Sequence, residues 1–475
     1  MWTHAIAVTA SGVVLAIGLG SAIHALLNKR DPRSQLGWVV LCVMLPFFGW
    51  FFYWLLGVNR IKTRAQKWQA RGRWGADLPP AMLESADPAR ADRMRSLLRL
   101  SHAVTNRPLL EGNRIDVLHN GDEAFPAMLE AIAGAEHTVH LCTYIFETGP
   151  VGAQFVEALG AASERGVTVR VLVDAIGEQY ARPRVTKLLQ KHKRVRVARF
   201  LPMVLSLRGL RVNMRNHRKI LAVDGRVGFT GGMNIGRRHL VRDPANKKCT
   251  VDIQFRIEGR AVAFLEESFA ADWHFTTRED TGWGGYKAMA SRGTALCRGI
   301  TDGPNEDLEK LQWVLIGALG AARERVCIMT PYFIPSREII AALSTAALRG
   351  VDVELILPRT SNLPYVAWAT NAMLWEMLQH GVRVFFRPPP FAHSKLFLVD
   401  DYYAIIGSAN IDPRSLRLNF EFNVEIYDGD LGKQLVAHFD EVRGASAEVT
   451  LKDMEDRSFG IKLRDSFAKI FAPYL

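Results

Sequence analysis

Residues 216–224 read NHRKILAVD, and residues 393–400 read HSKLFLVD. Both stretches contain the pattern H-x-K-x4-D. A turn of small residues ending in asparagine follows each at the same spacing, GGMN at 231–234 and GSAN at 407–410. Two copies with matched surroundings indicate a duplicated unit, and this duplication decides the expected fold.

The order of strand-like and helix-like segments around the two motifs also repeats. In each half a strand, a helix ending at glycine and a buried β-branched strand come first. These segments are 138–146, 155–165 and 167–174 in the first half, and 325–333, 339–349 and 351–357 in the second. Alternation of this kind predicts an α/β fold with a mainly parallel sheet covered by helices. We therefore expect two homologous α/β/α sandwich halves, 112–280 and 301–475, joined at 281–300 and packed face to face about a pseudo-twofold axis.

The motif carries groups suited to exchange at a phosphodiester. In an extended strand residues i and i+2 share a face, which pairs His217 with Lys219 and His393 with Lys395. One imidazole can attack phosphorus, and another can protonate the departing alkoxide because imidazole titrates near neutral pH. The lysines supply positive charge where negative charge gathers on oxygen. The same oxygens are expected to accept hydrogen bonds from the asparagines that end the two turns, Asn234 and Asn410.

Two uncharged stretches open the chain, and each is long enough to cross about 30 Å of hydrocarbon as a helix. They predict a transmembrane hairpin over residues 1–60, with spans at about 5–27 and 35–57; two buried core helices are the alternative. Pro46 is expected to kink the second span. A basic juxtamembrane region at 61–111 follows. The apolar segment 200–208 either dips into the bilayer or is an ordinary buried segment.

Basic residues near span ends mark the cytoplasmic side. The short connection between the spans carries three of them, and the segment after the second span carries six: Arg60, Lys62, Arg64, Lys67, Arg71 and Arg73. This difference predicts a multi-pass membrane protein with its catalytic part in the cytoplasm. The formal net charge of +12 suits either nucleic acid or an anionic membrane. The adjoining hairpin favours the membrane, so we expect no nucleic-acid partner.

Cysteine and histidine spacing gives no sign of a metal or a disulfide framework. The five cysteines are scattered, with no C-x-x-C pair. We expect reduced thiols, no metal and no cofactor. The sequence does not predict an oligomeric state.

The doubled motif with G-[GS]-x-N resembles the phospholipase D superfamily, over residues 110–475. Within that superfamily, KRDPR at 29–33, RNHRK at 215–219, TPYFIP at 330–335 and NFE at 419–421 resemble the bacterial cardiolipin synthases. The resemblance implies that two phosphatidylglycerols give cardiolipin and glycerol through a phosphatidyl-histidine. It also implies that the multi-pass protein lies in the bacterial inner membrane.

The resemblance also implies roles for single residues. His217 is expected to be the nucleophile and His393 the general acid and base. A later acid orients each histidine, and the matching positions are Asp252 in the first half and Glu421 in the second. The motif aspartates, Asp224 and Asp400, are counted with the catalytic residues, although the resemblance implies that their role is mainly structural. Ser408 is expected to support phosphate binding.

Alternative functions remain for the same residues. A membrane-bound phospholipase D would use water to give phosphatidic acid, and a related transferase would use phosphatidylethanolamine as donor. A nuclease is disfavoured because the predicted spans adjoin the motif and no aromatic and basic nucleic-acid signature is present. A structural membrane protein is disfavoured because both motifs are intact.

Overall fold

The computed structural model describes residues 2–29, 32–57, 88–202, 214–286, 290–304 and 307–472. The chain divides into two compact units, Met1–Arg73 with Leu205–Leu210, and Trp74–Val204 with Arg211–Leu475. Much of the expected basic region at 61–111, and most of the segment 200–208, lie outside the described residues.

The first unit begins with the long apolar helix α1 (Trp2–Asn28). Its part Val8–Asn28, with mean hydropathy 1.9, is the one helix among the described residues long and apolar enough to cross a membrane. The second apolar stretch forms three shorter pieces, α2 (Pro32–Met44), α3 (Pro46–Phe52) and a π-helical turn, Tyr53–Gly57. The break falls at Leu45 because Pro46 has no N–H to continue the helix.

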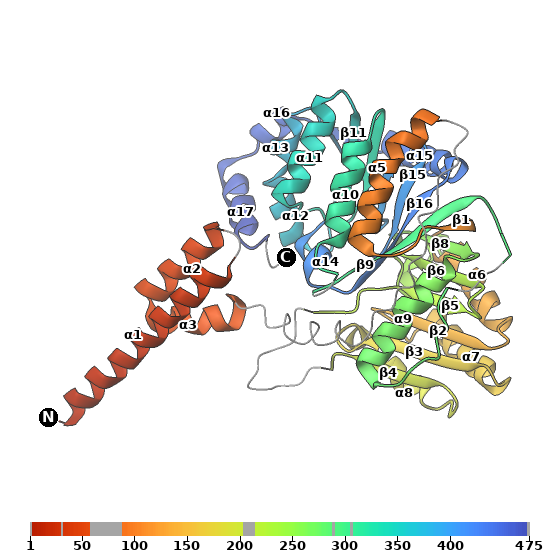
Figure 1. Ribbon diagram of the computed structural model, residues 1–475, viewed down its shortest axis with the longest axis horizontal. Helices are drawn as coiled ribbons and strands as arrows, with labels where there is room; N and C mark the ends of the chain where they lie inside the picture. Colours follow the sequence, from red (N-terminus) through yellow and green to blue (C-terminus); the bar gives the residue numbers. More distant parts are fainter. Residues whose placement is uncertain are drawn as a thin grey trace. The chain divides into compact units, whose positions relative to one another are not determined.

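The pieces after the break fold back on α2. Trp38 and Tyr53 are 15 residues apart in sequence, yet their ring centroids lie 5.5 Å apart. A side chain at Gly49 would collide with the backbone of Cys42, so only glycine permits this close return. Figure 1 shows α2 and α3 together beside α1. The expected second span at 35–57 is therefore not one continuous helix.

The segment from α2 to Gly57, called the second arm below, packs against α1, and its contacts show how far along α1 it extends. Pro46, at the turn, lies against Gly18, where an added Cβ would be 2.7 Å from the proline ring. Tyr53 then returns to His24, with 2.7 Å between its hydroxyl and Nδ1, and Trp54 Nε1 donates to Ser21 Oγ at 3.0 Å. The distance from Asn28 to Gly18 is about 15 Å along a helix, half the thickness of a bilayer core.

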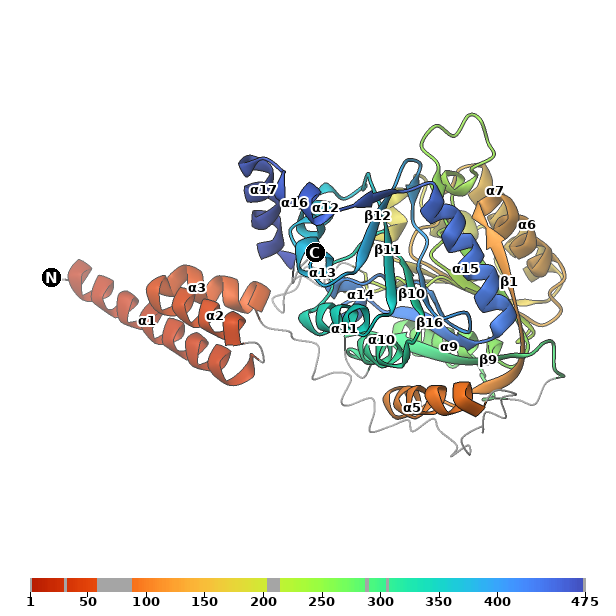
Figure 2. The same cartoon turned by 90° about the horizontal axis from the view of Figure 1, so that it is seen from above.

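The second unit contains one sheet of 15 strands flanked by helices (Figures 1 and 2). The first half supplies β1 (Leu110–His119), β2 (Thr138–Thr143), β3 (Thr168–Asp174), β4 (Arg196–Phe200), β5 (Ile220–Val223), β6 (Val227–Gly231) and β8 (Ile253–Glu258). The second supplies β9 (Ala295–Asp302), β10 (Arg325–Met329), β11 (Asp352–Pro358), β12 (Arg383–Arg387), β14 (Leu396–Val399), β15 (Tyr403–Gly407), β16 (Glu421–Tyr427) and β17 (Ala447–Val449).

Strand order repeats outward from the middle of this sheet. From the junction the first half runs β1-β8-β6-β5-β2-β3-β4 and the second β9-β16-β15-β14-β10-β11-β12-β17. The halves join where β1 and β9 pair antiparallel, with Asn113 opposite Ala295. The pseudo-twofold arrangement is confirmed, but the sheets do not pack face to face, because edge strands with free backbone groups pair directly. The prediction of a mainly parallel sheet is wrong. Among the described strands of this sheet, only β2-β3-β4 and β10-β11-β12 run parallel, and the other neighbouring pairs are antiparallel because the motif strands β5 and β14 return as hairpins with β6 and β15.

Helices cover both faces of the shared sheet. On one face lie α6 (Asn120–Ala133), α7 (Pro150–Glu164) and α8 (Val185–Leu189) of the first half and, of the second, α10 (Lys310–Ala321), α11 (Arg337–Leu348), α12 (Pro364–Asn371) and α13 (Leu374–Leu378). On the other face, α9 (Val262–Thr277) and α15 (Gly429–Gly444) share one core that contains Phe264 and Phe439 and continues across both halves.

The remaining helices lie near the second half. They are α5 (Pro88–Thr105), α14 (Pro413–Arg417), α16 (Leu451–Glu455) and α17 (Phe459–Ile470). α5 falls within the expected connecting region but buries Met94 and Leu97 in the core of the second half. Ser101 also donates to the buried Glu425 carboxylate at 2.9 Å, so part of this region belongs to the folded body.

Candidate active site

Each H-x-K segment lies just before the strand that carries the rest of its motif, β5 or β14. The lysine side chains turn back on their own segments: Lys219 Nζ donates to the His217 carbonyl, and Lys395 Nζ to the His393 carbonyl, both at 2.7 Å. Histidine and lysine of each copy are therefore held together, as the i, i+2 spacing predicts.

The segments are attached crosswise to the opposite half. The His217 N–H donates to the carbonyl of Phe420 at 2.9 Å, and the His393 N–H donates to the carbonyl of Val251 at 2.7 Å. Short strands β7 (Thr250–Val251) and β13 (Phe391–Ala392) pair in parallel at the second of these contacts. Each histidine thus meets the residue that precedes the acid of the other half.

The acids complete this crossing. His217 Nδ1 lies 2.9 Å from Glu421 Oε1, and His393 Nδ1 lies 2.9 Å from Asp252 Oδ2. Both carboxylates are buried, whereas the histidine side chains remain 14% and 12% exposed. A carboxylate at Nδ1 fixes the ring and leaves Nε2 for chemistry. Each acid therefore serves the histidine of the other half.

The histidines have unequal surroundings. Burial lowers the pKa of His217, with Lys219 acting in the same direction and Glu421 opposing both. Burial together with Lys395 lowers the pKa of His393 to about 3. Lys395 Nζ lies 3.2 Å from His393 Nδ1, which explains its strong effect. Burial and Lys395 alone would therefore leave His393 neutral at physiological pH.

The two lysines interact across the site. Burial lowers the pKa of Lys219 to about 7, and Lys395 acts in the same direction. Burial lowers the pKa of Lys395 to about 8, opposed by Asp252 and Glu421. Placing two like charges together costs energy until an anion lies between them. The pair is thus suited to bind the negative oxygens of a phosphodiester.

These shifts predict how turnover depends on pH. An ammonium group is lost as pH rises through its pKa, and both lysines are needed. We therefore expect kcat/KM, which reports the free enzyme, to fall by about tenfold per pH unit above about pH 7, where Lys219 titrates, and more steeply above about pH 8, where Lys395 follows. A Lys395→Arg variant should have a lower maximum but a flatter alkaline limb, since guanidinium stays charged. Initial rates over a pH series test this; an alkaline limb equally steep in the variant would contradict it.

The carboxylates are supported differently in the two halves. A Cβ at Gly232 would lie 2.8 Å from Asp252 Oδ1, so glycine makes room for that acid. At the matching position, Ser408 Oγ donates to Glu421 Oε2 at 2.5 Å, and Asn419 Nδ2 donates to Oε1 at 3.3 Å. Ser408 therefore supports the acid directly. Asn419 was not predicted, although it stands beside Glu421 in the NFE stretch.

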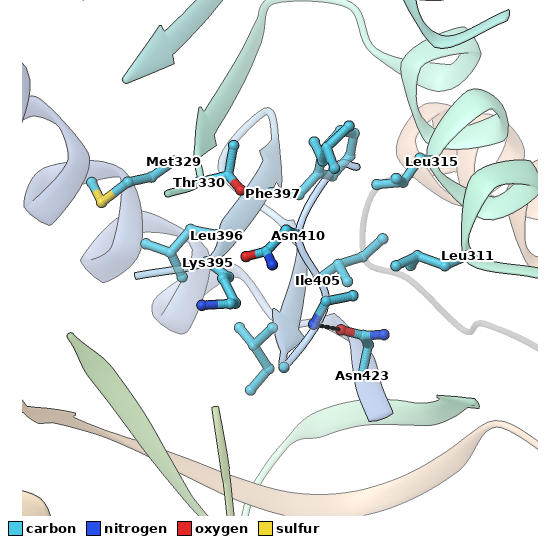
Figure 3. Close-up of a pocket in the computed structure, with 14 residues that line it drawn as sticks. Leu311, Leu315, Met329, Thr330, Lys395, Leu396, Phe397, Ile405, Asn410 and Asn423 are labelled. Atoms are coloured by element: carbon cyan, nitrogen blue, oxygen red, sulfur yellow. Dashed lines mark hydrogen bonds between the residues drawn. The ribbon is translucent and has the colours of Figure 1, made fainter. Parts of the chain in front are cut away.

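The two asparagines at the turns lie at the ends of β6 and β15. Asn234 Oδ1 accepts from the Ile145 N–H at 3.1 Å, which fixes its amide. Asn410 Nδ2 lies 3.3 Å from Ser415 Oγ, and its buried Oδ1 has no partner. Asn410 and Lys395 line a cavity of about 30 Å³, with Leu311 and Leu315 on its other side (Figure 3). That volume holds about one or two waters and no lipid headgroup.

The motif aspartates lie beyond the strands, away from the histidines. Asp224 accepts the N–H groups of Glu136, His137 and Thr138 at 2.7–2.8 Å. Asp400 similarly accepts from Glu324 at 2.9 Å. Both have positive φ, 53° and 54°. They hold the turns that lead into β2 and β10 and do not join the histidine–lysine cluster.

An Asp224→Asn substitution is therefore expected to lower stability more than turnover. It keeps a residue that tolerates positive φ but removes a charged acceptor of three amides, at a cost of about 1–3 kcal/mol. Those amides lower the carboxyl pKa although burial opposes them. The contribution is thus present above the unfolded pKa of about 3.9 and lost as pH falls through the folded value. Thermal unfolding in detergent, with exposed Glu157→Gln as control, measures the loss; unchanged stability with lost turnover would refute it.

Aromatic rings and a third histidine adjoin the cluster. Tyr144 and Tyr332 meet His217 and His393 edge-on, with ring centroids 5.3 and 6.3 Å apart. His239 is buried close to Asp252; burial lowers its pKa to about 4, while the Asp252 charge opposes the shift. Sequence reasoning assigned His239 no role, and a lone histidine between two basic stretches gives no signal for one. Among the described residues, no cluster of histidine, cysteine and acidic side chains could hold a metal.

Comparisons with known proteins agree with this architecture. The family model described as the phospholipase D-like domain of cardiolipin synthase matches residues 128–273 and 315–443. The chain belongs to this family. A second model, described as the phospholipase D-nuclease N-terminal region, matches residues 16–57, including the broken arm.

Individual relatives match along nearly the whole chain. A cardiolipin synthase of Oceanobacillus iheyensis is 30% identical, with 98% of each chain covered. Cardiolipin synthase A of Pseudomonas syringae is 33% identical, with 98% of this chain and 97% of the relative covered. The crystal structure of a phosphatidylserine synthase from Haemophilus influenzae is 16% identical and superimposes with a TM-score of 0.61, covering 80% of this chain and all of that one. It shares the fold.

Proposed function

We propose that this protein is a phosphatidyltransferase that converts two phosphatidylglycerols into cardiolipin and glycerol. The observation that carries the proposal is the composite site, in which the histidine of each half is held by a buried acid of the other, His217 by Glu421 and His393 by Asp252. Full-length similarity to cardiolipin synthases supports the choice of phospholipid substrates.

The reaction requires two displacements at one phosphorus. His217 Nε2 attacks the phosphorus of the first lipid, and the bond from phosphorus to the headgroup glycerol oxygen breaks. His393 gives that oxygen a proton, so that glycerol leaves and phosphatidyl-His217 remains. A headgroup hydroxyl of the second phosphatidylglycerol then gives its proton to His393, bonds to phosphorus and displaces His217.

This order requires His393 to carry a proton when the first lipid is bound. Burial and Lys395 lower its pKa. A bound phosphodiester adds negative charge beside the ring, which favours imidazolium, while Lys219 and Lys395 stay charged against the same oxygens. Lipid binding thus prepares the general acid, and Asn234 and Asn410 are the proposed additional donors to the phosphate.

A product assay tests the proposal. Purified protein in detergent receives phosphatidylglycerol, and cardiolipin, glycerol and phosphatidic acid are measured together. Cardiolipin with an equal amount of glycerol is the expected result. Phosphatidic acid alone would identify a hydrolase, and cardiolipin formed only when phosphatidylethanolamine is present would identify a different donor.

Membrane association follows from the family and from the apolar helix α1, and we further propose the orientation. Because the second arm turns back at Pro46, level with Gly18, the described ends at Asn28 and Gly57 lie on the same side of that turn. Arg and Lys residues follow both ends in the sequence, at 29–33 and at 60–73, and we assign them to that side. Positive residues mark the cytoplasmic side, so we assign the catalytic unit to the cytoplasm and the N-terminus to the opposite face. This proposal differs from the multi-pass hairpin expected from sequence.

Cysteine labelling in intact cells tests this orientation. Single cysteines at Thr3 and at Asn59, in a background without the native thiols, are treated with a membrane-impermeant maleimide. Position 3 should react and position 59 should react only after the membrane is opened. Equal protection of both positions would restore two full spans.

A further inference from the structure

The last helix, α17, turns its large apolar side chains toward solvent. Phe459, Leu463, Phe467 and Ile470 are 79%, 59%, 61% and 67% exposed, and Phe471 directly after the helix is 46% exposed. Successive residues rotate by about 100° around a helix, which places these side chains on one continuous face. An exposed apolar surface of this extent on one helix indicates a binding surface for another protein or for a membrane.

A buried acid on the opposite face, and basic side chains at the edges of the apolar face, fix how the helix is turned. Asp465 is fully buried and pairs with Arg457 at 2.8 Å and with Arg464 at 2.7 Å. Lys469 Nζ lies 3.1 Å from Glu376 of α13. A buried carboxylate with two arginine partners would lose both if the helix rotated to bury its apolar face. The exposed apolar face is thus a stable property of the fold.

Basic side chains border that face. With 3.6 residues per turn, Lys462 and Lys469 fall on one flank and Arg464 on the other. The Arg464 and Lys469 side chains stay 44% and 32% exposed although they are paired. An apolar stripe between cations is the pattern of helices that lie in the interface of an anionic bilayer.

We propose that the outward face of α17 rests in the surface of an anionic lipid bilayer and holds the catalytic unit against it. Three observations select lipid as the partner: the flanking cations, the apolar helix α1 in the same chain, and membership in a family that acts on phospholipids. The proposal does not depend on which phospholipid reacts or on the order of the two histidines.

The position of α17 connects this surface to the active site. α17 packs against α12, and Arg464 stacks over Trp368 of that helix, 4.6 Å from the ring centroid. Just before α12, Asn362 accepts the Tyr332 hydroxyl at 2.7 Å, and Tyr332 meets His393 edge-on. Helix α17 is thus linked through α12 to the histidine–lysine cluster of the active site.

Site-directed spin labelling of the full-length protein tests the contact. Cys249→Ser leaves four buried cysteines, and Phe467→Cys then carries the label. In nanodiscs of phosphatidylglycerol and phosphatidylcholine, we expect higher accessibility to oxygen than to a water-soluble nickel chelate. Phosphatidylcholine alone should reduce that difference. A label at exposed Gln434 on α15, far from α17 in Figure 2, should remain aqueous in both.

Activity supplies an independent reading. Leu463→Glu with Phe467→Glu should lower the rate on anionic vesicles by at least about fivefold and change the rate on detergent-dispersed lipid by less than about twofold. Gln434→Glu is the matched control and should leave both rates unchanged. A label that stays aqueous in anionic nanodiscs would overturn the proposal, as would labels on two copies approaching each other without lipid contact.

Discussion

A His393→Ala variant is expected to accumulate a phosphatidyl-enzyme that a His217→Ala variant never forms. Both changes should lower kcat by about 10⁴-fold or more, because each removes a group that acts at phosphorus. They should differ when the leaving group is an activated phenol, which departs without a proton. His217 can then still attack in the His393→Ala variant, and the missing base prevents resolution of the intermediate.

Intact-protein mass spectrometry measures this accumulation. The adduct should carry the mass of one phosphatidyl group, be released by mild acid as expected for a phosphoramidate, and map to the peptide containing His217. The double variant is the control and should show no adduct. An adduct on His393 in the His217→Ala variant would reverse the assigned order, and the absence of an adduct in every variant would reject covalent catalysis.

The acids give the second large effect, and the crossed contacts decide its pattern. Glu421→Gln and Asp252→Asn should each lower kcat by about 10²–10⁴-fold, because an amide cannot hold the imidazole as a carboxylate does. Glu421 contacts His217, so its variant should slow attack on phosphorus. Asp252 contacts His393, so its variant should slow proton transfer to the leaving group.

An activated leaving group separates the two variants. It should restore the rate of adduct formation in Asp252→Asn and leave Glu421→Gln slow, measured in single-turnover experiments. Glu157→Gln, a carboxylate lost from the exposed face of α7, should behave as wild type. If the restored variant were Glu421→Gln instead, the roles of the two histidines would be reversed, with His393 as the nucleophile and His217 as the general acid.

The sequence predicted the parts of the site that depend on local spacing. His217 with Lys219 and His393 with Lys395 follow from an i, i+2 pattern, and each β-α-β unit follows from buried β-branched runs and glycine-ended helices. The crossed acids could not be predicted, because no pattern within one half tells how that half meets the other. The pairing of β1 with β9 could not be predicted for the same reason, since the residues of an edge strand do not indicate which strand will pair with it.

The N-terminal arm shows a different limit. An uncharged run has the same composition whether it crosses the bilayer or turns back halfway. Pro46 indicated a kink, but the sharp return depends on glycines at 18 and 49, which let backbones meet at the turn. Those contacts join residues distant in sequence, so hydropathy alone missed them.

The exchange of acids between halves constrains how such a protein could arise. A single half carries His217 but not the carboxylate that holds it, so an ancestor of half the length would need a second identical copy to complete either centre. A symmetric homodimer satisfies this need, and fusion of two gene copies keeps the arrangement in one chain. In one chain the two centres can differ, and here they do: Gly232 makes room for Asp252, whereas Ser408 donates to Glu421.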